Sequence, residues 1–289
     1  MKNSFSTIEE AQKHYDKQMR KQNSKGIPEF EGYSPNDMYW IINFTFQEGS
    51  PVQMRKLTET EYDRIPIFRQ VRHLAQTLLK EGEIKLTAVG NLPVRIVAEL
   101  YPLGVSDWWI EYKKTKLIRE KDSESVHLAM ILIELMGVAK KRKKVLSLTK
   151  TGAKVVSDNI ALLALLIDAF SRQFNWAYFD GYGENKVGQL GFGFSLILLG
   201  KYGSEKHDDK FYAGKYFAAF PMLMGGLVPS YDTVEHEGAS CYSIRTFERF
   251  LLQLGLITIE QENKLLDEKI IVKTEIFDRL FKILPVGRA

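Results

Sequence analysis

Residues 137–152 read GVAKKRKKVLSLTKTG, and this stretch decides the fold that we predict. Gly137 stands where a helix ends in a left-handed residue, a conformation that glycine adopts without a steric penalty. The apolar and β-branched residues on either side of the basic run favour two short strands. Thr149 stands where a hydroxyl can cap the first N–H groups of a new helix. The predicted order is therefore helix, strand, hairpin tip, strand, helix.

The same order occurs in two further segments of the chain. Before this stretch, a helical pattern ends at Gly82, and a short strand leads to Thr87 at the start of another predicted helix. After it, a helical pattern ends at Gly255, and the predicted strand 270–272 leads to a helix that begins at Thr274. Such internal repetition predicts one fold class, mainly α with short antiparallel β wings (α+β).

This order resembles the winged-helix family, in which a helix ends at glycine, a β-wing follows, and a Leu-Thr-x-x-Gly step opens the next helix. Residues 148–152, Leu-Thr-Lys-Thr-Gly, match that step, and residues 86–90, Leu-Thr-Ala-Val-Gly, repeat it. Too few residues separate Gly82 from Leu86 for a true wing, and the segment after Gly255 lacks the later glycine. The resemblance implies degenerate winged-helix units packed on a central helical region.

Composition and pattern divide the chain into four regions. They are a polar N-terminal segment (1–30), a region with two winged-helix-like units (31–156), a central aromatic-rich helical region (157–231) and a C-terminal winged-helix-like unit (232–289). The polar segment contains a predicted helix over residues 7–21, and the Ser-Pro pairs at 34–35 and 50–51 are each typical of a helix start. The whole order of motifs is also similar to a bacterial protein family with no assigned function.

The composition of the 289 residues, with 45% apolar and 26% charged, is that of a folded globular chain. These proportions exclude a wholly disordered protein and a coiled-coil rod. Cys241 is the only cysteine, which excludes an intrachain disulfide and a cysteine-rich zinc module and favours a reducing compartment. The first residues lack the apolar region of a signal peptide. We therefore expect a cytoplasmic protein.

Two stretches without charge, residues 187–200 and 216–231, are the candidates for membrane-spanning helices. Both are shorter than the roughly 20 apolar residues that a membrane-spanning helix needs. Glycine and proline also interrupt them, which suits buried segments with close backbone contacts. We predict that both belong to the protein core and that the chain has no membrane partner.

The overall charge does not require a nucleic-acid partner, because 40 Lys and Arg oppose 36 Asp and Glu, a net charge of +4. The clearest local cluster is the basic run Lys140–Lys144. The usual interpretation of such a run is a solvated loop or wing tip, and contact with nucleic-acid phosphates is the alternative.

In winged helices that read DNA, the helix before the wing enters the major groove and carries polar donors on its outer face. The helix 126–136 offers only His127 and Glu134, so it is predicted to be buried. The helices before Gly82 and Gly255 carry more donors. Together with the basic run, the candidates for nucleic-acid contact are Arg69, Gln70, Arg72, His73, Gln76, Lys80, Lys140, Lys141, Arg142, Lys143, Lys144, Arg245 and Arg249.

Acidic side chains in the segment after Gly255 act against such contact, because they repel phosphate. They are Glu260, Glu262, Asp267 and Glu268. All three units also allow the simpler interpretation that they are packing modules whose polar residues solvate an outer face.

No two histidines or cysteines have the spacing of a local metal motif, so no metal or cofactor is predicted. The best candidate for chemistry is Glu235-His236-Glu237 with Cys241 nearby, because a glycine-rich apolar segment before it is suited to forming a pocket wall. A Cys/His pair needs spatial proximity, and Cys241 is more typical of a small buried hydrophobe.

Three functions therefore remain after the sequence has been considered. The leading hypothesis is a protein-interaction or scaffold protein built of winged-helix-like modules. The alternative is a DNA- or RNA-binding protein that uses the basic candidates. The third is an enzyme with a site near Glu235, His236 and Cys241.

Overall fold

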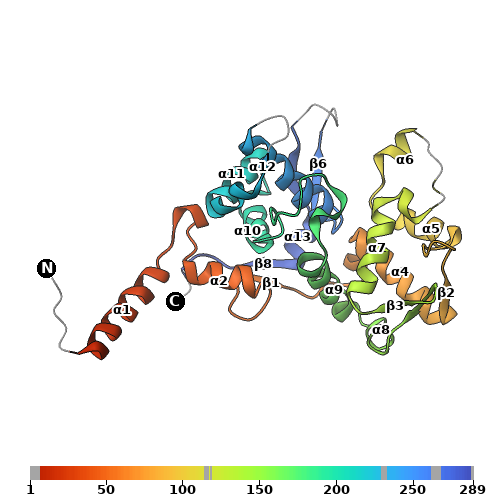
Figure 1. Cartoon of the computed structure of the whole chain (residues 1–289), viewed down its shortest axis with the longest axis horizontal. Helices are drawn as coiled ribbons and strands as arrows, with labels where there is room; N and C mark the ends of the chain where they lie inside the picture. Colours follow the sequence, from red (N-terminus) through yellow and green to blue (C-terminus); the bar gives the residue numbers. More distant parts are fainter. Residues whose placement is uncertain (1–6, 114–116, 118, 229–232, 262–267, 288–289) are drawn as a thin grey trace.

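Most of the chain is helical, and its strands form three small antiparallel sheets, as the computed structural model shows (Figure 1). The structure describes residues 7–113, 117, 119–228, 233–261 and 268–287. The expected class, mainly α with short antiparallel β segments, is confirmed. None of the described helices is long and apolar enough to cross a membrane.

Helix α1 (Ile8–Asn23) extends away from the rest of the chain in Figure 1. Thr7 caps it, because its hydroxyl accepts a hydrogen bond from the Glu10 backbone N–H at 3.2 Å. Within the described part of the chain, no contact buries any residue of α1. The helix expected over residues 7–21 is therefore present, and its apolar side chains face solvent.

The Ser-Pro pair at 34–35 starts a helix as expected. After the short turn η1 (Pro28–Phe30), helix α2 (Pro35–Asn43) begins with a capping box between Ser34 and Asp37. The Asp37 backbone N–H donates to Ser34 Oγ at 3.2 Å, and the Ser34 backbone N–H donates to Asp37 Oδ2 at 2.9 Å. Two backbone donors at the helix end are thus satisfied within four residues of sequence.

The Ser-Pro pair at 50–51 does not start a helix, so this prediction was wrong. A strand, β1 (Val52–Met54), follows it and pairs antiparallel with β8 (Phe281–Ile283). The partner strand lies at the far end of the chain, so no local pattern indicates it.

The N-terminal unit, residues 66–155, combines helices with one three-stranded sheet and follows the short helix α3 (Glu59–Tyr62). Its elements in chain order are α4 (Pro66–Glu81), β2 (Glu83–Lys85), α5 (Val94–Leu100), η2 (Tyr101–Leu103), α6 (Trp108–Lys113), η3 (Glu120–Asp122), α7 (Glu124–Leu135), β3 (Ala139–Arg142), β4 (Val145–Leu148) and α8 (Lys150–Val155). Strand β4 lies between β2 and β3. The two segments that the sequence indicated as separate units therefore share a single sheet.

The C-terminal unit, residues 192–280, has the same order of elements and the same strand order, β5–β7–β6. Its elements are α10 (Phe192–Tyr202), β5 (His207–Asp208), α11 (Asp209–Ala219), η6 (Pro221–Gly226), α12 (Val234–Tyr242), the π-helix η7 (Ser243–Leu251), β6 (Ile257–Glu260), β7 (Ile270–Lys273) and α13 (Glu275–Leu280). Its first helices and first strand come from residues 157–231, which the sequence indicated as a separate central region.

The glycine-to-threonine connection has the same geometry in both units. Gly137 and Gly255 have φ of 65° and 67°, the left-handed conformation expected for them. The Thr149 hydroxyl donates to the Gly137 carbonyl at 2.6 Å, and the Thr274 hydroxyl donates to the Gly255 carbonyl at 2.7 Å. Each threonine therefore fastens the end of one helix to the start of another across a β-hairpin.

Thr87 does not start a helix, so this prediction was wrong. Its hydroxyl accepts a hydrogen bond from the Asn91 backbone N–H at 3.0 Å and closes a turn instead. Helix α5 begins later, after Pro93, which has extended backbone angles. Proline has no N–H of its own and disfavours helix in the residue before it, which explains the delayed start.

Helix α9 (Asn159–Asp168) and its continuations η4 (Ala169–Gln173) and η5 (Trp176–Phe179) connect the two units. Helix α9 contacts α4, and η4 contacts α7, while the Phe170 ring lies 5.0 Å from the Phe250 ring of the C-terminal unit. Phe170, Phe174 and Trp176 are buried here, whereas Tyr178 is 55% exposed. The core is therefore continuous across the two units.

Candidate functional site

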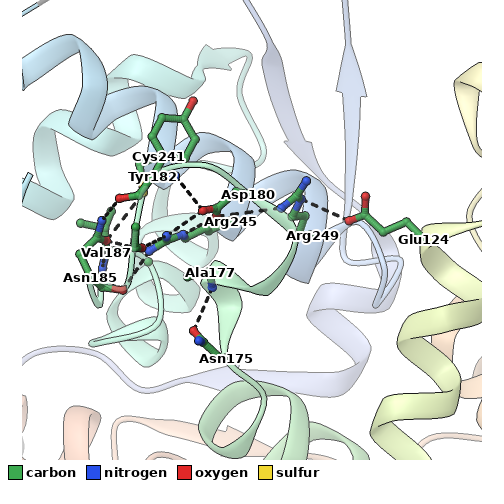
Figure 2. A network of polar contacts seen from close by, with 12 residues as sticks. Glu124, Asn175, Ala177, Asp180, Tyr182, Asn185, Val187, Cys241, Arg245 and Arg249 are labelled. Carbon is green, nitrogen blue, oxygen red and sulfur yellow. Dashed lines mark hydrogen bonds and ion pairs between the residues drawn. The ribbon is translucent and has the colours of Figure 1, made fainter. Parts of the chain in front are cut away.

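An extensive polar network surrounds Arg245 on η7, as Figure 2 shows. The Arg245 side chain is 0% exposed, and its guanidinium forms a bidentate pair with Asp180, through Nε to Oδ2 at 2.7 Å and Nη2 to Oδ1 at 3.0 Å. Nη1 also donates to the main-chain oxygen and Oδ1 of Asn185, and Nη2 donates to the Gly183 carbonyl. All five guanidinium N–H donors are thereby used.

This network holds the loop between η5 and α10 against the C-terminal unit. The loop offers one carboxylate, one amide and two main-chain carbonyls to Arg245. A buried charge is tolerated only when it is paired and hydrogen-bonded in this way. Arg245 was a candidate for nucleic-acid contact, and that prediction was wrong, because the side chain is enclosed and has no donor left for a phosphate.

Cys241 belongs to the same buried network and does not serve the enzyme hypothesis. Its Sγ lies 3.8 Å from Asn185 Oδ1, and burial raises the pKa of the thiol to about 12, so the thiol is neutral near pH 7. Glu235 and His236 are exposed and line a different cavity, of about 490 Å³, between α11 and α12. The described lining of that cavity does not include Cys241.

A second cavity, of about 370 Å³, lies between the two units. It is lined by the residues that precede and start α6, by the start of α7, and by the end of η7 with the turn that follows. Arg249 of η7 crosses toward the N-terminal unit, where its Nε lies 3.2 Å from Glu124 Oε1, as Figure 2 shows. Arg249 is therefore an inter-unit contact, although it was a candidate for nucleic-acid contact.

Most of the polar candidates on α4 have partners inside the protein. Gln70 is fully buried and donates to the Leu100 carbonyl at 3.1 Å, so its assignment as a nucleic-acid contact was wrong. Arg72 pairs with Asp63, and His73 Nε2 lies 3.2 Å from Glu99 Oε2.

The remaining candidates on α4 are nearer to solvent. Arg69 donates to the Pro102 carbonyl at 3.3 Å, whereas Gln76 and Lys80 are exposed on the same helix. The helix therefore does not present its polar residues as one free surface.

Helix α7, which precedes the basic hairpin, is buried along most of its length, as predicted. Of its two polar candidates, His127 contacts Glu120 through Nδ1 and Oε1 at 2.6 Å. Glu134 is partly buried, and that burial raises the pKa of its carboxyl group. The helix therefore has no donor-rich outer face with which to read bases.

The basic run forms the β3–β4 hairpin and stands in solvent. Lys140, Arg142, Lys143 and Lys144 are exposed, and no ion pair joins any of them to an acidic side chain in the described part of the chain. Lys141 is different, because its Nζ donates to the Gly90 carbonyl at 2.5 Å and fixes the hairpin to the turn before α5. The structure thus gathers four cations without acidic partners, among the described residues, on one hairpin.

The hairpin tip has an unusual backbone. Arg142 pairs with Val145, so Lys143 and Lys144 form a two-residue turn, and both have positive φ, 49° and 61°. Asn-Gly is the preferred pair for such turns, because a side chain with a Cβ costs about 1–2 kcal/mol per residue in the left-handed region. Two lysines therefore occupy positions where the backbone favours other residues.

The acidic residues expected to repel phosphate in the C-terminal unit are partly neutralised. Glu260 lies 2.5 Å from Lys206 Nζ, and Glu268 lies 2.7 Å from Lys210 Nζ. Glu262 and Asp267 lie outside the described residues. The described acids of the second hairpin are therefore paired with lysines, whereas the first hairpin is strongly basic.

Among the described residues, no group of three or more His, Cys, Asp or Glu side chains is placed to hold a metal ion. Comparisons with protein-family models, with curated proteins and with solved structures found no match. A functional proposal therefore depends on the basic β3–β4 hairpin and the other features of the structure described above.

Proposed function

We propose that this protein binds the phosphate backbone of nucleic acid through the β3–β4 hairpin. The observation that carries the proposal is the cluster of four exposed cations, Lys140, Arg142, Lys143 and Lys144, none of which has an acidic partner in the described part of the chain. Cations of this kind release condensed counterions from nucleic acid when they bind phosphates, which drives association. Lys140 and Arg142 lie on one face of β3, because alternate strand residues share a face.

The position of the hairpin supports this proposal. From α7 to α8 the chain runs helix, strand, turn, strand, helix, which is the order expected around a wing and supports a wing-like role for this hairpin. The helix that would read bases, α7, is buried instead. The binding should therefore depend on salt and show little preference for sequence.

The proposal is tested by fluorescence polarisation with two labelled duplexes of unrelated sequence, each of about 20 base pairs. Four phosphate contacts predict a slope of about −3.6 in a plot of log affinity against log salt, so raising salt from about 50 to about 200 mM lowers affinity roughly 100-fold. The variant Lys143→Gln/Lys144→Gln should halve that slope and weaken binding at low salt at least about tenfold.

A matched control removes two exposed lysines elsewhere. Lys56→Gln/Lys282→Gln causes the same loss of charge near β1 and β8, and it should leave the slope unchanged. No binding at low salt, or an equal loss of affinity in the control, would exclude the hairpin as the binding element. A strong preference for one duplex would contradict the role given to the buried helix α7.

A second candidate function is association between two copies of the chain through α1. Ile8, Tyr15 and Met19 are 84%, 58% and 59% exposed, and their spacing places them along one side of the helix. The first turn carries Glu9 and Glu10, and the last turn carries Arg20 and Lys21. Two antiparallel copies of α1 would therefore place opposite charges next to each other.

Sedimentation equilibrium tests this association. The wild-type chain should show a concentration-dependent dimer, and Tyr15→Ser/Met19→Ser should shift it to monomer, because the variant removes the apolar side of α1. Met222→Ser, which removes another exposed apolar side chain, is the control and should retain the dimer. A wild-type chain that stays monomeric at every concentration would rule out this function.

A further inference from the structure

The cavity between the two units has an acceptor-rich lining. Three carboxylates, those of Asp107, Glu124 and Glu248, line its volume of about 370 Å³, which is in the range of small-molecule sites. One cation, Arg249, lies among them. Lys269 pairs with Glu248 at 2.5 Å but does not belong to the described lining. Carboxylates therefore outnumber cations at the cavity surface.

Gln253 gives an independent indication of a ligand. Its side chain lines the same cavity and the residue is only 7% exposed, yet Oε1 is buried without a hydrogen-bond partner in the described structure. A buried acceptor left unpaired costs about 1–3 kcal/mol, so water or a ligand group is expected beside it. Arg249 Nη1, in the same lining, is a buried donor that also has no hydrogen-bond partner in the described structure. A donor group in the cavity would satisfy this oxygen.

Trp108 provides an aromatic surface beside the carboxylates. It lines the cavity at the start of α6, and its ring stacks on Tyr112 with centroids 4.8 Å apart and planes 8° from parallel. Indole rings attract cations through the negative face of the ring. Carboxylates, an unpaired carbonyl oxygen and an indole together form the kind of lining that recognises an organic cation.

We infer that the cavity between the two units binds a small molecule that carries an ammonium or guanidinium group. The cationic group contacts Glu124 and Gln253 Oε1, and the rest of the molecule lies beside Trp108. This inference goes beyond the proposed function and does not depend on it.

The electrostatics around Glu124 are consistent with this site. Burial raises the pKa of the Glu124 carboxyl group, Arg249 opposes that change, and Asp107, Glu248 and Asp180 add to it. Arg249 Nη1 lies 4.0 Å from Asp180 Oδ2, so the guanidinium retains a second carboxylate nearby when a ligand takes Glu124. Nη1 itself has no hydrogen-bond partner in the described structure, so Asp180 gives it only this longer ionic contact.

Isothermal titration of the full chain with agmatine, which carries both an ammonium and a guanidinium group, tests the inference. Saturable binding at one site is expected. Glu124→Gln should weaken it at least tenfold, and Glu248→Gln and Gln253→Leu should each weaken it several-fold. Glu248 is partly exposed, so its variant should fold even if another does not. Glu235→Gln, in the cavity between α11 and α12, should bind as the wild type does.

Three results would overturn the inference. They are the absence of saturable agmatine binding up to about 10 mM, unchanged affinity in folded Glu124→Gln and Glu248→Gln, and binding of succinate in place of agmatine. The last result would assign the cavity to anions held by Arg249.

Discussion

The N-terminal and C-terminal units share one order of elements and one strand order, but they differ in where they place their cations. The N-terminal unit carries four free cations on a short hairpin in solvent. The C-terminal unit encloses Arg245 in its interior and pairs the described acids of its hairpin with lysines. The two units thus have the same order of elements, but one presents cations to solvent and the other uses a buried cation for an internal ion pair.

This difference shows that topology alone does not define a nucleic-acid interface. In both units the helix before the hairpin lies largely in the core. In the N-terminal unit it packs with apolar side chains, whereas in the C-terminal unit it contributes a charged side chain that fastens a loop. The two hairpins differ in charge, and the β3–β4 hairpin is the strongly basic one.

The largest expected effect comes from breaking the buried pair between Arg245 of the C-terminal unit and Asp180 of the loop before it. Asp180→Asn leaves Arg245 buried without a compensating charge, so we expect the free energy of unfolding to fall by about 3–5 kcal/mol. Urea denaturation followed by circular dichroism measures this change.

The matched control is at the start of the N-terminal unit, where Arg72 pairs with Asp63, a largely exposed residue just before the unit. Asp63→Asn should cost at most about 1 kcal/mol, because solvent screens such a pair. If the two aspartate variants lost equal stability, the contrast between an internal and a surface ion pair in the two units would be untenable.

An intermediate effect is expected at the basic hairpin tip. Lys143→Asn/Lys144→Gly provides the residues that the positive φ angles favour, so the free energy of unfolding should rise by about 1–2 kcal/mol. Nucleic-acid affinity should fall at the same time, because two cations are lost. The same urea denaturation and polarisation measurements apply.

This variant separates stability from function in the N-terminal unit. A gain of stability together with unchanged affinity would show that the turn lysines do not contact phosphate. A loss of stability would show that their side chains contribute to the fold.

The smallest expected effect depends on pH and concerns Glu31, which joins the segment before α2 to the C-terminal unit. Its Oε2 lies 2.5 Å from Lys201 Nζ, and its Oε1 lies 2.8 Å from Lys215 Nζ. Burial tends to raise the pKa of this carboxyl group, but hydrogen bonds from Lys201, Lys215 and Tyr202 outweigh it and hold the pKa below its ordinary value of 4.5.

A lowered pKa stabilises the fold above the unfolded value, and that stabilisation is lost as the pH falls below about 4.5. Glu31→Gln should therefore cost about 1 kcal/mol at neutral pH and progressively less in acid. Thermal melts of both proteins over this pH range measure the difference. A penalty that grew toward acid would reverse the sign assigned to the group.

Sequence reasoning found much of the fold and little of the candidate site. The residue types at Gly137, Gly255 and Thr149 predicted where helices end and begin, and the basic hairpin was also predicted. The partners of Arg245 were missed, because Asp180 lies 65 residues away along the chain. The one local signal was the setting of Arg245 among Cys241, Tyr242 and Phe247, which indicates an arginine on a buried face.

The sequence by itself determined the helix ends at Gly137 and Gly255, the caps at Ser34 and Thr149 and the charge of the hairpin, because backbone preference and side-chain charge belong to each residue and its close neighbours. The tertiary structure decided which strands pair and which cations remain in solvent. Strand β2 joins β4, β5 joins β7 and β1 joins β8, and each pair is far apart in sequence. Burial and pairing are properties of the folded chain as a whole, so two units with one order of elements place their arginines in opposite environments.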